Sequence, residues 1–145
     1  MLALALSPSA VKPFMGQILR EEIFDTFDVR TVDILAQARV NLDTASEAGF
    51  SSWAALRPLV YAIIKASPKP KHVKIVLSYP AARVDNIHPN AAALFLNLVY
   101  ENDSVTFTTA TAQKEFALDK TLDGAWDEWV GRFFAEKGLS VTDRE

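Results

Sequence analysis

The clearest pattern of hydrophobic and polar positions lies in the last third of the chain. Apolar residues alternate with polar ones in LFLNLVY (94–100), and a second alternating run, VTFTTAT (105–111), follows after the tetrapeptide ENDS (101–104). Alternation of this kind predicts two antiparallel strands, and Asn and Asp tolerate the positive φ that a tight turn between them needs. The expected register places Leu98 opposite Phe107, so that the leucines share one face of the hairpin.

Residues 119–134 supply a candidate cover for this apolar face. Large apolar side chains recur there at three- and four-residue spacing, which predicts an amphipathic helix. The stripe consists of Trp126, Trp129, Val130, Phe133 and Phe134. Burying each aromatic side chain is worth roughly 1.5–3 kcal/mol, so the four together rival the net stability of a small domain. We therefore interpret the stripe as core that packs on the leucine side of the hairpin.

The rest of the chain predicts further strands and helices. In order, the pattern indicates a short strand at 1–6, a helix with its apolar stripe at 11–19, and a long alternating strand at 32–43 that is bent or folded into a hairpin near Ala36. An almost wholly apolar helix at 52–67, which Ser51 or Ser52 caps, and a strand at 73–79 follow. This order lacks the regular strand–helix alternation of a Rossmann or barrel fold. We predict an α+β fold: a mostly antiparallel sheet of about five to six strands packed with three helices, including the aromatic C-terminal helix. No linker or repeat divides the chain, so residues 1–145 are expected to form a single domain.

Composition and charge narrow the class of protein. The chain has 145 residues, of which 50% are hydrophobic, and a formal net charge of −3, so no overall positive field attracts nucleic acid or membrane. The absence of cysteine excludes disulfides, thiolate chemistry and zinc–sulfur sites. The opening MLALALSPSAV has no basic segment, and no apolar run is long enough to span a bilayer, so we expect a soluble cytoplasmic protein.

Recognised catalytic and cofactor motifs do not occur in the sequence. The five glycines are too scattered for a dinucleotide fingerprint or a phosphate loop. His72 and His88 form no HExxH pair, although a Ser/His/acid triad could still assemble from distant positions. The sequence therefore predicts no catalytic residue, no cofactor and no resident metal.

Three acids spaced four residues apart stand near the start of the last helix: Asp119, Asp123 and Asp127. On one continuous helix they would lie along one side and could hold a hard cation such as Mg²⁺. Acids in a first turn also complement the helix dipole and cap its free N–H groups, which is the interpretation we favour. Together with Lys120, they form the surface on which we would first expect a partner to bind.

Positive charge concentrates in a short stretch before the strand at 73–79. Lys65, Lys69, Lys71 and Lys74 lie within ten residues. A phosphate-rich partner would suit such a patch, but no glycine nest or interleaved aromatic residue accompanies it. The interpretation we favour is a solvated connector that protects a neighbouring strand edge from aggregation.

Several segments resemble a bacterial family of unknown function, of the type found in Gram-positive anaerobes. The most specific of these segments is the DKTLD-x-AWD motif at 119–127, followed by KIVLSYP (74–80) and LFLNLVYENDSVTFTTAT (94–111). FDTFDV (24–29) and the Ser-x-Trp start of the second helix (51–53) also fit, so the resemblance covers nearly the whole chain. It implies no catalytic residue and no ligand.

The order of elements also resembles, at the level of fold alone, one domain of a sliding DNA clamp. The helices of a clamp need basic outer faces, and this chain offers only Lys12, Arg20, Arg57 and Lys65 for that purpose. Our leading hypothesis is a small non-enzymatic module that binds a protein partner or a second copy of itself. The alternatives are a clamp-like protein associated with nucleic acid and a metal-assisted enzyme that uses the three spaced acids.

Overall fold

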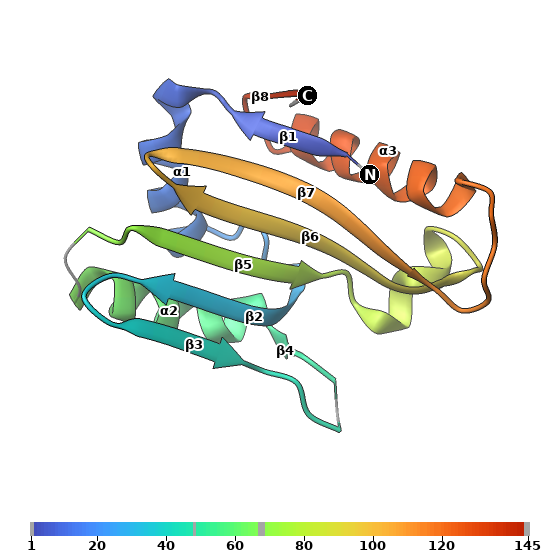
Figure 1. Cartoon of the computed structure of the whole chain (residues 1–145), viewed down its shortest axis with the longest axis horizontal. Coiled ribbons are helices and arrows are strands. Elements are labelled where there is room, and N and C mark those ends of the chain that lie inside the picture. The colour runs from blue at the N-terminus through green and yellow to red at the C-terminus, as the bar shows by residue number, and fades with distance from the viewer. Residues whose placement is uncertain (1, 48, 67–68, 144–145) are drawn as a thin grey trace.

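The computed structural model describes residues 2–47, 49–66 and 69–143 of the chain, and within these ranges it has eight strands and four helices (Figure 1). No helix in this part of the chain is both long enough and apolar enough to cross a membrane. The elements in order are β1 (Ala3–Leu6), α1 (Pro8–Arg20), β2 (Asp28–Leu35), β3 (Arg39–Asp43), β4 (Ser51–Ser52), α2 (Trp53–Ala66), β5 (His72–Ser78), the 3₁₀-helix η1 (Ala81–Asn86), β6 (Ala91–Glu101), β7 (Ser104–Gln113), α3 (Thr121–Glu136) and β8 (Val141–Asp143).

All strands join one antiparallel sheet in the order β3-β2-β5-β6-β7-β1-β8, and β4 pairs with β2 beside this path. The predicted α+β class and the antiparallel sheet are therefore confirmed. The predicted strand number, five to six, is wrong: the described chain has eight strands. The predicted helix number is also too low by one, because η1 adds a fourth helix.

The additional strands come from segments that are too short to show a pattern. β4 has two residues and β8 has three, so neither completes the alternation from which a strand is recognised. The long alternating run was expected to be either a bent strand or a hairpin, and it is a hairpin. A turn after Leu35 divides it into β2 and β3, which pair with Ile34 opposite Val40.

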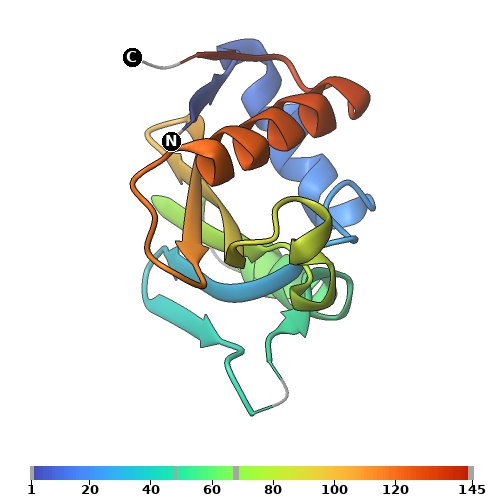
Figure 2. The same cartoon turned by 90° about the vertical axis from the view of Figure 1, so that its right-hand side faces the viewer.

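The three α-helices cover one face of the sheet and leave the other face open (Figure 2). The covered face carries the core, which joins alternate residues of the strands to buried residues of all three α-helices. Neighbouring residues of β5 show the division: Val73 and Ile75 are fully buried, whereas Lys74 between them is exposed on the open face. A sheet with one apolar and one wet face is the arrangement that the alternating pattern predicts.

The β6–β7 hairpin has the predicted register and turn. Leu98 lies opposite Phe107 and Tyr100 opposite Val105. Asn102 and Asp103 have φ angles of 52° and 59°, so both turn residues adopt the left-handed conformation that a two-residue hairpin requires. The register prediction is confirmed because the turn and the apolar pattern specify the same pairing.

Helix α3 packs its aromatic stripe on the core side of this hairpin, as predicted. Phe134 is buried against Phe107, with 4.7 Å between the ring centroids. Trp126 is fully buried, and its Nε1–H donates a 2.9 Å hydrogen bond to the Phe95 carbonyl oxygen on β6. Gly138 has a φ of 69° and ends the helix as a Schellman cap, in which the N–H of Leu139 bonds to the Phe134 carbonyl oxygen.

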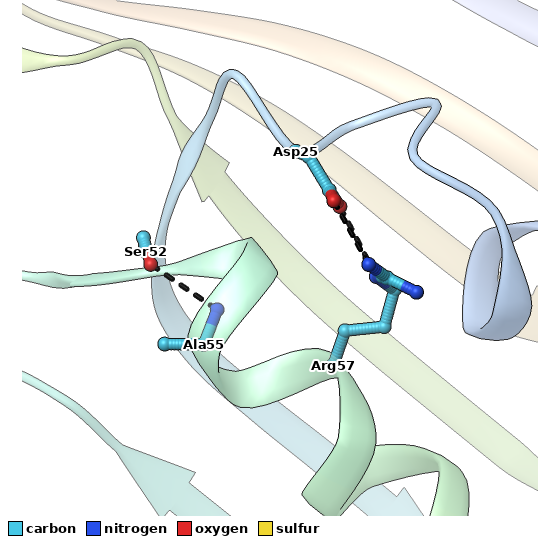
Figure 3. Close-up of polar contacts among 4 residues, drawn as sticks. All are labelled: Asp25, Ser52, Ala55 and Arg57. Carbon is cyan, nitrogen blue, oxygen red and sulfur yellow. Dashed lines mark hydrogen bonds and ion pairs between the residues drawn. The ribbon is translucent and has the colours of Figure 1, made fainter.

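The connection between α1 and β2 is fastened to α2 by an ion pair (Figure 3). Both carboxylate oxygens of Asp25 accept hydrogen bonds from the Arg57 guanidinium group, at 3.1 and 2.9 Å. Of the two serines expected to cap α2, Ser52 does so, because its hydroxyl oxygen accepts a 3.2 Å bond from the N–H of Ala55 (Figure 3). These contacts cap the first turn of α2 and join the helix to the connection between α1 and β2.

Candidate functional site

The acids at the start of α3 do not form one continuous row. Asp119 precedes the helix, and its carboxylate accepts hydrogen bonds from the backbone N–H and the hydroxyl of Thr121. Asp123 and Asp127 lie on the helix face toward β7, where the hydroxyls of Thr111 and Thr109 donate to them. Within the described ranges, no three Asp, Glu, His or Cys side chains converge as metal ligands. Asp119 and Lys120 remain exposed at this end of the molecule.

The four clustered lysines are divided between two sides of the sheet. Lys65 ends α2 on the covered side, where its ammonium group lies 5.7 Å from the Tyr61 ring centroid. Lys69 pairs with Asp103 in the hairpin turn, Lys71 is exposed, and Lys74 points out from the open face of the sheet. Lys74 therefore lies on the opposite side of the sheet from Lys65.

The basic residues considered for a clamp lie on α1 and α2. Arg57 is committed to its ion pair with Asp25, with both side chains largely buried. Lys12 and Arg20 are exposed on α1, and the Arg20 guanidinium group donates to the Gly16 carbonyl oxygen. No observation made on these four residues favours nucleic-acid binding.

His88 belongs to a hydrogen-bond chain that fastens the start of α3. Its Nδ1 accepts the N–H of Asn90, so Nε2 carries the proton and donates to the Thr121 hydroxyl at 3.1 Å. The Thr121 hydroxyl in turn donates to Asp119, and these bonds hold the pKa of the Asp119 carboxyl below its usual value. The order acid, hydroxyl, imidazole differs from a nucleophilic triad, in which the imidazole stands between the other two groups.

Two large apolar side chains on the connection between β7 and α3 are exposed to solvent. Phe116 is 85% exposed and Leu118 is 84% exposed, in a segment of sequence KEFALDK. This segment, residues 114–120, is named the 114–120 loop below. It adjoins Asp119 and Lys120, where partner binding was predicted, but the sequence interpretation missed both apolar residues. The sequence did offer one indication of these two residues, because they fit neither the alternating pattern of β7 nor the apolar stripe of α3.

Hydrogen bonds to two side-chain amides hold the 114–120 loop in place. The Asn90 amide donates to the Glu115 carbonyl oxygen and accepts from its N–H, at 2.9 and 3.0 Å. The Gln113 amide makes the same pair of bonds with Ala117, at 3.2 and 3.1 Å. Lys114 also forms a 2.7 Å ion pair with Asp85 of η1. The backbone on both sides of Phe116 is therefore fixed, although the ring itself contacts solvent.

A hollow in the described structure lies between α1, the end of α2, the following residues Lys69 and Pro70, and the β6–β7 turn. Its volume is about 520 Å³, within the range of roughly 300–1,000 Å³ that is usual for ligand pockets. Its apolar lining consists of Pro8, Val11, Met15, Leu19, Ile64 and Pro70. We name it the α1–α2 cleft. The elements that line it lie toward the left-hand end of Figure 1, whereas the 114–120 loop lies at the right-hand end.

Four polar residues also line this cleft: Lys12, Lys69, Tyr100 and Asp103. Asp103 accepts hydrogen bonds from the Lys69 ammonium group and, at 3.0 Å, from the Tyr100 hydroxyl. The bond from Lys69 lowers the pKa of Asp103 and raises the pKa of Lys69. Burial raises the pKa of the Tyr100 hydroxyl. Lys12 makes no ion pair or hydrogen bond with the other described residues, so the edge of the cleft carries one uncompensated positive charge.

Comparison with known proteins places the chain in a family. No curated protein and no solved structure matches it. The model of a family of unknown function, DUF5721, matches residues 41–142, which is more than half of the chain and includes the DKTLD-x-AWD segment and the whole β6–β7 hairpin. The chain therefore belongs to the DUF5721 family, whose function is unknown.

Proposed function

We propose that this protein is a small binding module that associates with a second copy of itself through the 114–120 loop. The observation that carries the proposal is the pair of side chains Phe116 and Leu118, 85% and 84% exposed on a backbone that side-chain amides hold in place. Exposed apolar side chains are common singly, but two neighbouring large ones next to charged residues are typical of a contact surface.

The fixed backbone supports a binding role for Phe116 and Leu118. Apolar anchors contribute most to an interface when they insert into a pocket of the partner. Their contribution is larger when the loop is already ordered, because less conformational entropy is then lost on association. The bonds from Asn90 and Gln113 supply this order before any partner arrives.

The edge of the sheet offers a weaker surface for self-association. β3 is the edge strand at one end of the sheet, but it has only five residues. Exposed Arg39 and Asp43 stand at its two ends. Short edge strands with charged residues resist pairing with another sheet.

Sedimentation velocity over a concentration series from about 1 µM to about 1 mM tests the proposal, since this range covers weak and moderate dissociation constants. The expected result is a sedimentation coefficient that rises with concentration for the unaltered protein and stays constant for a variant carrying Phe116→Ser and Leu118→Ser. The matched control is Leu59→Ser, which removes an apolar side chain that is 49% exposed on α2 and should associate normally. A protein that remains monomeric at the highest concentration contradicts the proposal.

A further inference from the structure

We infer that the α1–α2 cleft of one copy receives Phe116 and Leu118 of another, so that the copies join head to tail. This inference rests on the proposed function and adds the receptor site and the geometry of the contact. The elements that line the cleft and the 114–120 loop lie at opposite ends of the long axis of the molecule (Figure 1), so one copy cannot use its own cleft.

The chemistry of the two surfaces is complementary. The loop presents one aromatic and one aliphatic side chain, and the cleft presents six apolar residues around a hollow of about 520 Å³. Among the residues the structure describes, no other large hydrophobic side chain is as exposed as Phe116 and Leu118. Removing both apolar surfaces from water is the main driving force for such a contact.

The charges beside the two surfaces also match. In the loop Lys114 is paired with Asp85, so Glu115, Asp119 and Lys120 remain and leave a net charge of −1. At the cleft Lys69 is compensated by Asp103, which leaves the positive charge of Lys12. Opposite net charges at the two ends favour the head-to-tail orientation and oppose contacts between two loops or between two clefts.

A head-to-tail contact uses different surfaces on the two copies. It leaves a free loop at one end of every dimer and a free cleft at the other, so further copies add until a ring closes or the chain stops growing. Association that uses this contact is therefore not limited to the dimer.

Mixing two variants, each defective in one surface, tests the inference. The loop variant carries Phe116→Ser and Leu118→Ser, and the cleft variant carries Met15→Glu, which places a negative charge among the apolar lining residues. Each variant alone should remain monomeric, with its dissociation constant raised at least tenfold. Their mixture should form a one-to-one heterodimer and nothing larger, because only one intact loop and one intact cleft remain.

A second cleft variant keeps the test decisive if Met15→Glu fails to fold. Lys12→Glu changes an exposed residue at the edge of the cleft and should weaken association without altering the circular dichroism spectrum. If Met15→Glu and Lys12→Glu both associate like the unaltered protein while the loop variant does not, the inference is overturned and the proposed function stands. If the unaltered protein is monomeric throughout, both are overturned. Binding of the loop variant to itself overturns both the inference and the proposed function, because both place the contact on the 114–120 loop.

Discussion

Truncating Phe134 to alanine should destabilise the protein far more than truncating Phe116, although the two substitutions are chemically identical. Phe134 is 1% exposed and contacts Phe107 and Phe24, at centroid distances of 4.7 and 6.5 Å. Removing a buried phenylalanine side chain costs about 3–5 kcal/mol, the sum of lost burial and the cavity left behind. Phe116 is 85% exposed, so its truncation should change the free energy of unfolding by no more than about 0.5 kcal/mol.

Urea unfolding followed by tryptophan fluorescence measures both effects. At about 0.05–0.15 kcal/mol per residue, the 145-residue chain has a total stability of roughly 7–22 kcal/mol, so the Phe134→Ala variant should still fold. With a denaturant slope of about 2 kcal/mol per M, the midpoint should fall by about 1.5–2.5 M for Phe134→Ala and stay nearly constant for Phe116→Ala. Low protein concentration is needed, because association of native copies would raise the apparent stability. Similar midpoint losses for the two variants would refute this account of α3 and of the loop.

Three further predictions concern single groups in the fold. Trp126→Phe removes the donor to the Phe95 carbonyl oxygen and should cost about 1–3 kcal/mol in the same unfolding assay; an unchanged midpoint would show that the bond contributes nothing. Gly138→Ala meets no neighbouring atom but places alanine at a φ of 69°, so we expect a loss of about 1–2 kcal/mol, whereas a neutral result would mean that the helix end relaxes. Burial raises the pKa of Asp28, so the folded state holds this proton more tightly than the unfolded state does. This tighter binding of the proton stabilises the folded state fully below the unfolded pKa of about 3.9. The stabilisation is lost as the pH rises through the pKa of Asp28 in the folded state. Asp28→Asn should therefore stabilise the protein at pH 7 and lose this advantage below pH ~3.9; thermal melts at the two pH values check the sign, and a stabilisation that is equal at both would contradict it.

The parts of the fold that the sequence predicted correctly are those with a complete local pattern. The β6–β7 hairpin combines long alternation with turn residues that accept positive φ, and these signals agree on one register. The stripe of α3 recurs from Trp126 to Phe134, over more than two turns of the helix, and has a single apolar surface against which it can pack. The two-residue β4 and the three-residue β8 are strands only because neighbouring strands pair with them, so their own residues could not reveal them.

The candidate site could be predicted only in part. The sequence directed attention to Asp119 and Lys120, which lie beside the exposed Phe116 and Leu118. It could not show that Asp123 would bond to a threonine of β7, because that contact joins two separate elements. The α1–α2 cleft is also invisible in the sequence, since three distant segments of chain form its walls.

An amide chemical-shift series at increasing protein concentration tests the central claim of head-to-tail association most directly. The account predicts that amides of the 114–120 loop and amides around the α1–α2 cleft shift together, with one dissociation constant, while amides of the β3 edge stay constant. The Phe116→Ser, Leu118→Ser variant should show neither set of shifts. Shifts confined to the loop, shifts centred on β3, or no shifts at any concentration would contradict the account.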